Sequence, residues 1–191
     1  MNENLRLFIA VKFDNKVNSL VEKVTNSIKD YAKIKPVAIN NLHVTLAFLG
    51  SQQKTYVNKI TNCLDAIKSK PITVYFDKFS FFERNSSPTV FFLNGFSEEL
   101  ANLTKNLRNC LKKNRITFDN KKFIIHLTGA RIKTVFNKKR LYDFIDKINE
   151  NFKKISSQVN EITLFQSTLT KEGPIYSPLY IKKLSQEETD G

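Results

Sequence analysis

The stretch NNLHVTLAFLG, residues 40–50, carries one of only two histidines in this 191-residue chain, and FIIHLTGARIK, residues 123–133, carries the other. In both stretches threonine stands two positions after the histidine, and alanine stands two positions after the threonine. A single His-x-Thr is a weak signal, but one frame shared by both histidines is far more specific. The two frames are His43-Val44-Thr45-Leu46-Ala47 and His126-Leu127-Thr128-Gly129-Ala130.

Each frame lies in an apolar run that is typical of a β-strand. Because strand side chains alternate between two faces, we expect the histidine, threonine and alanine of each frame to share one face. Two such strands facing each other would form a symmetric cleft with two imidazoles and two hydroxyls. The core-facing positions are expected to hold Val44, Leu46 and Phe48 in the first strand, and Ile125, Leu127 and Gly129 in the second.

Strand-like and helix-like patterns alternate along the rest of the chain. Asp14 and Ser97 stand where helix N-caps are expected, and Pro36 is expected to end the helix that follows Asp14. The turn ERNSSP, residues 83–88, predicts a hairpin between two strands. Further strands are expected over 5–13, 42–49, 72–82, 89–95, 159–168 and 178–184, and helices over 15–33, 57–67, 98–113 and 141–152.

The two halves of the chain repeat one pattern of strand, helix, strand with the histidine frame, and helix. This repeat predicts an α+β fold with two pseudo-repeated lobes of antiparallel sheet, flanked by helices, around a central cleft. No linker-like segment separates the halves, so we expect residues 1–191 to form a single bilobal domain. Residues 185–191 are expected to be a frayed tail.

The composition narrows the classes of protein that fit. The formal net charge of +13 and the pI near 9.7 favour a polyanionic partner such as nucleic acid. No apolar run is long enough to span a bilayer and no signal-peptide pattern is present, so a cytoplasmic location without membrane contact is expected. Cys63 and Cys110 are expected to be buried free thiols, and the scattered His and Cys residues predict no metal site.

Paired histidines in one cleft are suited to acid–base chemistry near neutral pH. A neutral imidazole can take a proton from an attacking water while an imidazolium protonates the leaving oxygen. Threonine hydroxyls can donate hydrogen bonds to the phosphoryl oxygens as charge builds up on them. This set needs no cofactor if the leaving group is good enough, and a strained 2',3'-cyclic phosphate of RNA meets that condition.

The paired frames resemble those of the two-histidine (2H) phosphoesterase superfamily, and in particular its RNA 2',3'-cyclic phosphodiesterases, also called 2'-5' RNA ligases. The resemblance also covers RLFIAV, residues 6–11, and the closing segment, residues 161–184. It implies hydrolysis of a terminal 2',3'-cyclic phosphate on RNA, for example on tRNA fragments, to a 2'-phosphomonoester. It implies no cofactor and no obligate protein partner, and a monomer is expected.

By motif order, the resemblance implies that His43 is the proton donor and His126 the proton acceptor. Thr45 and Thr128 would bind the phosphoryl oxygens, and Arg131 would be an additional phosphate contact. Gly129 departs from the family pattern, in which a bulky apolar residue is usual, and a looser packing of the core is expected there.

Three alternatives use the same fold. The protein could act chiefly as a 2'-5' RNA ligase or as a 2'-5' oligonucleotide phosphodiesterase, since both use the same cleft chemistry. Substrate choice would then lie in loops such as 83–88 and 135–139. It could instead be a non-catalytic RNA-binding module, which suits the positive charge but not two intact frames.

Overall fold

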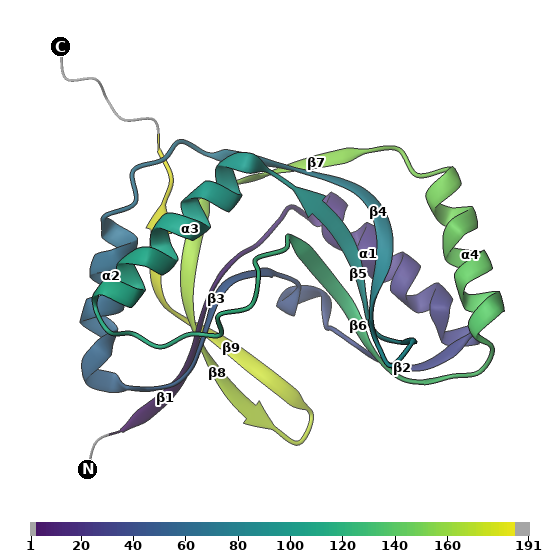
Figure 1. Ribbon diagram of the computed structural model, residues 1–191, viewed down its shortest axis with the longest axis horizontal. Helices are drawn as coiled ribbons and strands as arrows, with labels where there is room; N and C mark the ends of the chain where they lie inside the picture. The colour runs from purple at the N-terminus through teal and green to yellow at the C-terminus, as the bar shows by residue number, and fades with distance from the viewer. Residues whose placement is uncertain (1–2, 186–191) are drawn as a thin grey trace.

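Two antiparallel sheets lie side by side in the computed structural model, which describes residues 3–185 (Figure 1). The expected α+β fold with two lobes is confirmed. One sheet has the strand order β3 (Val44–Gln53), β1 (Asn4–Val11), β8 (Glu161–Thr170) and β9 (Gly173–Lys183). The other has the order β2 (Ala32–Pro36), β6 (His126–Val135), β5 (Ser87–Phe96), β4 (Ile72–Arg84) and β7 (Ile155–Val159).

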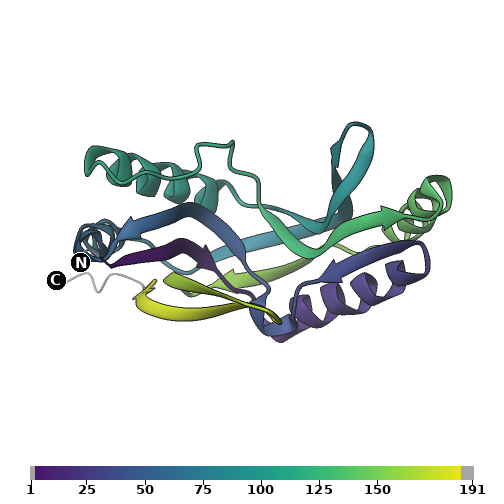
Figure 2. The same cartoon turned by 90° about the horizontal axis from the view of Figure 1, so that it is seen from below.

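A pair of helices accompanies each sheet (Figure 2). Helix α2 (Val57–Asp65) contacts β9 and α3 (Glu98–Lys113) contacts β3, and the two helices also contact each other. Helix α1 (Asn15–Ser27) contacts β5 and β6, and α4 (Lys138–Glu150) contacts β4. Single turns of 3₁₀-helix occupy Ile28–Asp30, Ile39–Asn41 and Lys54–Tyr56.

The caps predicted for two helices are confirmed. The Asp14 carboxylate accepts a hydrogen bond from the backbone N–H of Val17 at 3.0 Å, and the Ser97 hydroxyl accepts one from that of Leu100 at 3.3 Å. Each satisfies a donor that has no partner within the first turn of its helix. Glu98 and Glu99 stand in the first turn of α3, where the helix dipole favours negative charge.

The predicted end of the first helix was wrong. The expected helix reached residue 33, but α1 ends at Ser27 and Ala32–Pro36 forms strand β2. Pairing with β6 satisfies the backbone of this segment, from Ala32 opposite Val135 to Pro36 opposite Ala130. Since β2 is an edge strand, Pro36 is tolerated there although it has no N–H to donate. The short strand β7 was also not predicted, whereas the hairpin β4–β5 was.

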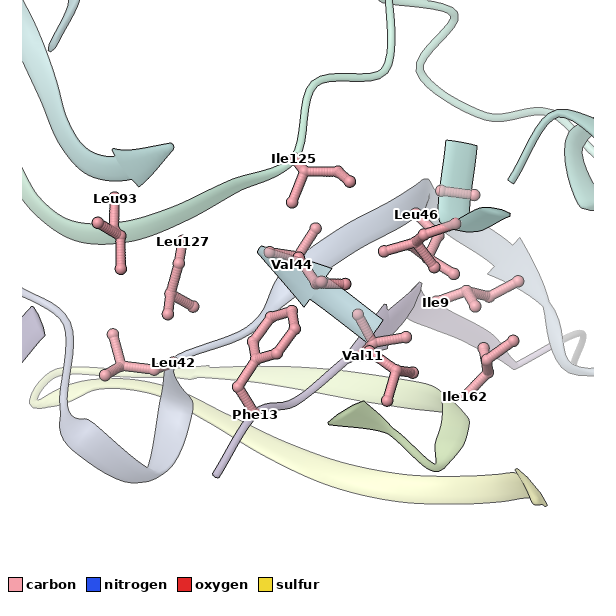
Figure 3. Packing of buried hydrophobic residues seen from close by; sticks show 14 of the residues in the cluster. Ile9, Val11, Phe13, Leu42, Val44, Leu46, Leu93, Ile125, Leu127 and Ile162 are labelled. Carbon is pink, nitrogen blue, oxygen red and sulfur yellow. The ribbon is translucent and has the colours of Figure 1, made fainter. Parts of the chain in front are cut away.

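One core runs between the helices and both sheets (Figure 3). Val44 and Leu46 of the first frame pack there beside β1, and Ile125 and Leu127 around the second frame pack beside Leu93 of β5. These four core-facing predictions are confirmed, since each side chain is at most 5% exposed. Both histidine strands are therefore anchored in the same apolar interior, which holds the two lobes together.

The prediction of two free thiols was wrong, because Cys63 and Cys110 form a disulfide. Both lie on the apolar sides of their helices, as expected, but those sides face each other where α2 packs on α3. Sequence spacing could not show this, since the two residues are 47 positions apart and the pairing depends on how the helices pack.

Two further features concern the ends of the chain and the lipid bilayer. Ser185 is exposed after β9, and the rest of the expected frayed tail lies outside the described residues. Within residues 3–185, no helix is both long enough and apolar enough to cross a bilayer.

Candidate active site

A cleft of about 620 Å³ lies between the two lobes and is lined by both histidine frames. His43 stands immediately before β3 and His126 is the first residue of β6. His43, Thr45, His126, Thr128 and Arg131 all line this cleft, so the structure brings the five candidate residues together around one space.

Both imidazoles are held by the same backbone interaction. The Nδ1 atom of His43 lies 2.6 Å from the carbonyl oxygen of Asn41, and the Nδ1 atom of His126 lies 2.7 Å from that of Ile124. A carbonyl oxygen can only accept a hydrogen bond, so Nδ1 must carry the hydrogen in both rings. The Nε2 atom is therefore the one that exchanges a proton in each ring.

The environments of the two Nε2 atoms differ. That of His43 lies 3.1 Å from the hydroxyl oxygen of Thr45. That of His126 has no hydrogen-bond partner among residues 3–185. A neutral His43 can thus accept a hydrogen bond from the Thr45 hydroxyl, whereas the Nε2 lone pair of a neutral His126 can face a ligand.

Two aromatic rings pack against the imidazole of each histidine. The His43 ring packs against Phe8 and Tyr176, with centroids 5.0 and 5.4 Å away. The His126 ring packs edge-on against Phe82 and Phe92, at 5.0 and 5.7 Å. These rings fix the orientation of each imidazole and exclude water from its sides.

Burial lowers the pKa of both histidines. For His43, desolvation is the main cause, the Asn41 carbonyl opposes it, and the positive charges of Lys12 and of a protonated His126 lower the pKa further. For His126, burial lowers the pKa and the Ile124 carbonyl opposes it. Both rings therefore favour the neutral form, and simultaneous protonation of both is disfavoured.

The predicted positions of the two alanines and of Phe48 were wrong. Ala47 and Ala130 are buried in the core rather than facing the cleft, and Phe48 lines the cleft rather than the core. Both strands contain a bulge inside the frame: Leu46 has no partner on β1, and Gly129 has none on β5. An extra residue in one strand shifts the alternation of the residues that follow it.

Because of the bulges, the residues that face the cleft have the same spacing in both frames. After each histidine, the side chains that line the cleft stand two and five positions later: Thr45 and Phe48 in the first strand, Thr128 and Arg131 in the second. Phe48 and Arg131 therefore occupy equivalent places in the two lobes. This is the structural reason that Arg131 reaches the cleft.

The close approach of helix α1 accounts for the glycine at position 129. A Cβ atom at this position would lie 2.2 Å from the hydroxyl oxygen of Thr25 and 3.2 Å from a methyl group of Val21. Helix α1 therefore fills the space that a larger side chain would take. The expected loosening of the core was wrong, because the smaller residue is matched by the close approach of the helix.

Further residues that sequence reasoning missed also line the cleft, among them Arg6 and Lys35. The Arg6 guanidinium lies over the Phe48 ring, 4.9 Å from its centroid. With Arg131, these residues give the cleft three cations, which suits an anionic ligand. The alternation in LRLFIAV, where Arg6 and Phe8 share a face, is the signal that could have found two of the missed residues.

The loops predicted to govern substrate choice do not line the cleft. Neither residues 83–88 nor residues 135–139 contribute to it. The connection from Lys35 to Asn41 and the tip of the β8–β9 hairpin, which includes Leu169 and Ile175, take that place. Leu169 and Ile175 are 68% and 56% exposed, and both side chains are available to a bound ligand.

The polar side chains that line the cleft include imidazoles, hydroxyls and cations, and also the Asn41 amide and the Glu172 carboxylate. Within residues 3–185, no three His, Cys, Asp or Glu side chains gather as a group that could hold a metal ion. The imidazoles of the cleft can move protons, and its hydroxyls and cations can hold an anion by hydrogen bonds and positive charge.

Comparisons with known proteins agree with this geometry. The family model described as LigT like phosphoesterase matches the chain twice, over residues 9–92 and 93–176. The boundary between the two matches falls inside β5, so each match contains one histidine frame.

Curated relatives align over nearly the whole chain. An RNA 2',3'-cyclic phosphodiesterase of Archaeoglobus fulgidus is 31% identical over 93% of this chain and 99% of its own length. A protein of the same description from Thermotoga maritima is 31% identical over 92% and 94%. Among solved structures, apo LigT of Escherichia coli has a TM-score of 0.73 at 23% identity, covering 96% of this chain and 99% of its own, which supports the fold.

Proposed function

The chain belongs to the LigT-like phosphoesterases, and from that premise we propose that it hydrolyses a terminal 2',3'-cyclic phosphate on RNA to a 2'-phosphomonoester. The membership makes it a phosphodiesterase. The observation that carries the specific proposal is the arrangement of two Nε2 atoms and two threonine hydroxyls around one basic cleft.

His126 is the proton acceptor in this proposal. Its Nδ1 is held by the Ile124 carbonyl, its pKa is lowered by burial, and its Nε2 has no hydrogen-bond partner within residues 3–185. A neutral Nε2 takes a proton from the attacking water, and the water oxygen forms a bond to phosphorus. The bond from phosphorus to the 3' oxygen then breaks.

His43 is the proton donor. In its protonated form, Nε2–H gives its proton to the departing 3' oxygen, so the product carries a 3' hydroxyl and a 2' phosphate. A bound phosphate favours this charged form, because a neighbouring anion raises the pKa of an imidazole. Proton exchange between the two rings and solvent restores the starting state.

Thr45 and Thr128 would donate hydrogen bonds to the phosphoryl oxygens. They stand at equivalent places beside the two histidines and both line the cleft. Arg131 would add a charge-assisted contact from the same strand as Thr128. These donors stabilise the charge that develops on phosphorus-bound oxygens in the transition state.

The test is turnover of an RNA oligomer that ends in a 2',3'-cyclic phosphate, in the presence of EDTA. We expect a 2'-phosphate product from the intact protein. An exclusively 3'-phosphate product, or no turnover, would contradict the proposal. Joining of 2'-5' ends, or cleavage of 2'-5' oligonucleotides with no action on the cyclic end, would favour one of the related enzymes instead.

The proposal also covers the domain organisation, the oligomeric state and the location of the protein. The two lobes would form a single domain and the protein would act as a monomer. We place its action in the cytoplasm, although a disulfide such as Cys63–Cys110 persists mainly in oxidising compartments. Fractionation of native cells, with thiol labelling of the recovered protein, tests this location.

A further inference from the structure

An aromatic and basic cluster lies outside the cleft on the five-stranded sheet. The rings of Tyr75 and Phe96 stack at 5.4 Å between centroids and 21° between planes. The Lys154 ammonium lies over both rings, 4.7 Å from the Tyr75 centroid and 4.4 Å from that of Phe96. We call these three residues the aromatic platform.

The platform shares the sheet face that carries His126. Asn94 of β5 pairs directly with His126, and Phe96 stands two residues further along the same strand. Tyr75 of β4 pairs with Phe96. Directly paired residues project to the same side, so the platform lies roughly 7 Å, one strand repeat, beyond the neighbour of the catalytic imidazole.

The fold does not use these rings as core. Tyr75 and Phe96 are 40% and 41% exposed, whereas Phe76, the next residue of β4, is fully buried and packs against Phe13. The open face thus presents two stacked aromatic rings under a cation. Aromatic rings for bases, beside a cation for phosphates, are the features by which proteins bind single-stranded nucleic acid.

We propose that the aromatic platform binds a nucleotide of single-stranded RNA upstream of the terminal nucleotide. This rests on the proposed function, since the cleft would hold the cyclic phosphate end. A base would stack on Tyr75 or Phe96, and Lys154 would contact a backbone phosphate. The net charge of +13 and the place of the platform on the sheet face that carries His126 favour RNA over a protein as the occupant.

One acidic residue bears on the path of the RNA backbone. Asp77 accepts a hydrogen bond from the Asn94 side chain at 2.9 Å on this face. Its carboxylate repels phosphates close to Asn94, so the phosphate contact is expected at Lys154. The base, which is uncharged, can pass this position.

Fluorescence anisotropy with a labelled, short single-stranded RNA ending in a 2'-phosphate tests the platform directly. We expect the double variant Tyr75→Ala/Phe96→Ala to bind about tenfold more weakly. Lys154→Ala should lower the slope of log affinity against log salt by about 0.7. Phe136→Ala is the matched control, because Phe136 is 63% exposed and lies away from the cleft and the platform, and its affinity should not change.

Turnover then separates this inference from the proposed function. For the double variant, kcat/KM for a cyclic-phosphate oligomer should fall about tenfold relative to kcat/KM for a 2',3'-cyclic mononucleotide. If the intact protein turns over neither substrate while the affinities change as expected, the platform stands and the proposed function fails. If the double variant bound RNA with unchanged affinity, the proposal of an RNA-binding platform would be wrong and a protein would be the alternative occupant. Equal losses on both substrates would also overturn it, since the rings would then only support the fold around His126.

Discussion

The two lobes hold their histidines in the same way and differ in what surrounds the reactive nitrogen. In both, a carbonyl two residues upstream holds Nδ1, two aromatic rings flank the imidazole, and a bulge resets the strand after the threonine. In the first lobe Nε2 contacts Thr45, and Phe48 occupies the fifth position. In the second lobe Nε2 has no hydrogen-bond partner among the described residues, and Arg131 occupies the fifth position.

This difference teaches how a duplicated scaffold can perform an asymmetric reaction. The shared features fix two proton-exchanging atoms at one cleft. In the proposed mechanism, the features that differ would separate the two roles, because the partner of Nε2 and the nearby charges set when each ring holds a proton. The cyclic phosphate itself is asymmetric, with a nucleoside on one side and attacking water on the other.

The largest effect should come from removing either imidazole. His43→Ala and His126→Ala should each lower kcat on a cyclic-phosphate oligomer by roughly a hundredfold to ten-thousandfold, as expected for loss of a general acid or base. Single-turnover kinetics measure this, with circular dichroism to check folding. If one variant kept near-normal kcat, the paired mechanism would be wrong.

Removing a threonine hydroxyl should sharpen the comparison between the lobes. Thr45→Val and Thr128→Val should each lower kcat/KM roughly tenfold to a hundredfold, because a hydrogen bond to a charged oxygen is lost. Thr45→Val should also shift the pH profile and Thr128→Val should not, since Thr45 contacts the Nε2 atom of His43 and no such contact joins Thr128 to His126 in the described part of the chain. Serine at the same positions should restore most of the activity; equal pH shifts in both valine variants would contradict the asymmetry.

One substitution should disrupt the packing at the second bulge, and a second substitution should restore it. Gly129→Ala should destabilise the protein by about 1–3 kcal/mol, because the new methyl group meets the Thr25 hydroxyl. Thr25→Ala removes that hydroxyl, which is buried and has no hydrogen-bond partner among the described residues. Denaturant unfolding of the double variant should therefore recover much of the loss, and purely additive effects would rule out the contact.

The smallest expected effect is on stability against pH. The folded-state pKa of both histidines lies below the ordinary 6.5, so below that pH the unfolded chain binds more protons than the folded one. Stability should fall as the pH drops from about 6.5 towards the folded-state values, and this contribution should be constant above 6.5.

Glutamine variants at the two histidines test this pH dependence. His43→Gln should flatten the dependence of stability on pH between pH 7 and 5 more than His126→Gln does. The reason is that the charges of Lys12 and His126 lower the pKa of His43 in addition to the effect of burial. Urea unfolding across this range measures the difference. Identical curves for the two variants and the intact protein would show that neither ring contributes.

The sequence was sufficient for the parts of the site that depend on local pattern. The repeated frames predicted two strands, a shared cleft, and the buried partners Val44 and Leu127. Strict alternation failed at Ala47 and Ala130, because a bulge changes which side each later residue faces. The apolar pattern of a strand does not reveal where such a bulge occurs.

Long-range packing explains the other residues that were not predicted. Tyr176 and Phe82 contact His43 and His126, but they come from strands that are distant from these histidines in the sequence. The Cys63–Cys110 disulfide likewise depends on the packing of two helices. A single sequence holds no signal for such pairings.

The most direct test of the paired-histidine account is the pH dependence of kcat/KM on a 2',3'-cyclic phosphate oligomer, measured in EDTA. The account predicts a bell-shaped profile, since one imidazole must be neutral and the other protonated, and the two limbs belong to the pair as a unit. Activity that is lost in EDTA and restored by a divalent metal would contradict it, as would a profile without an acidic limb.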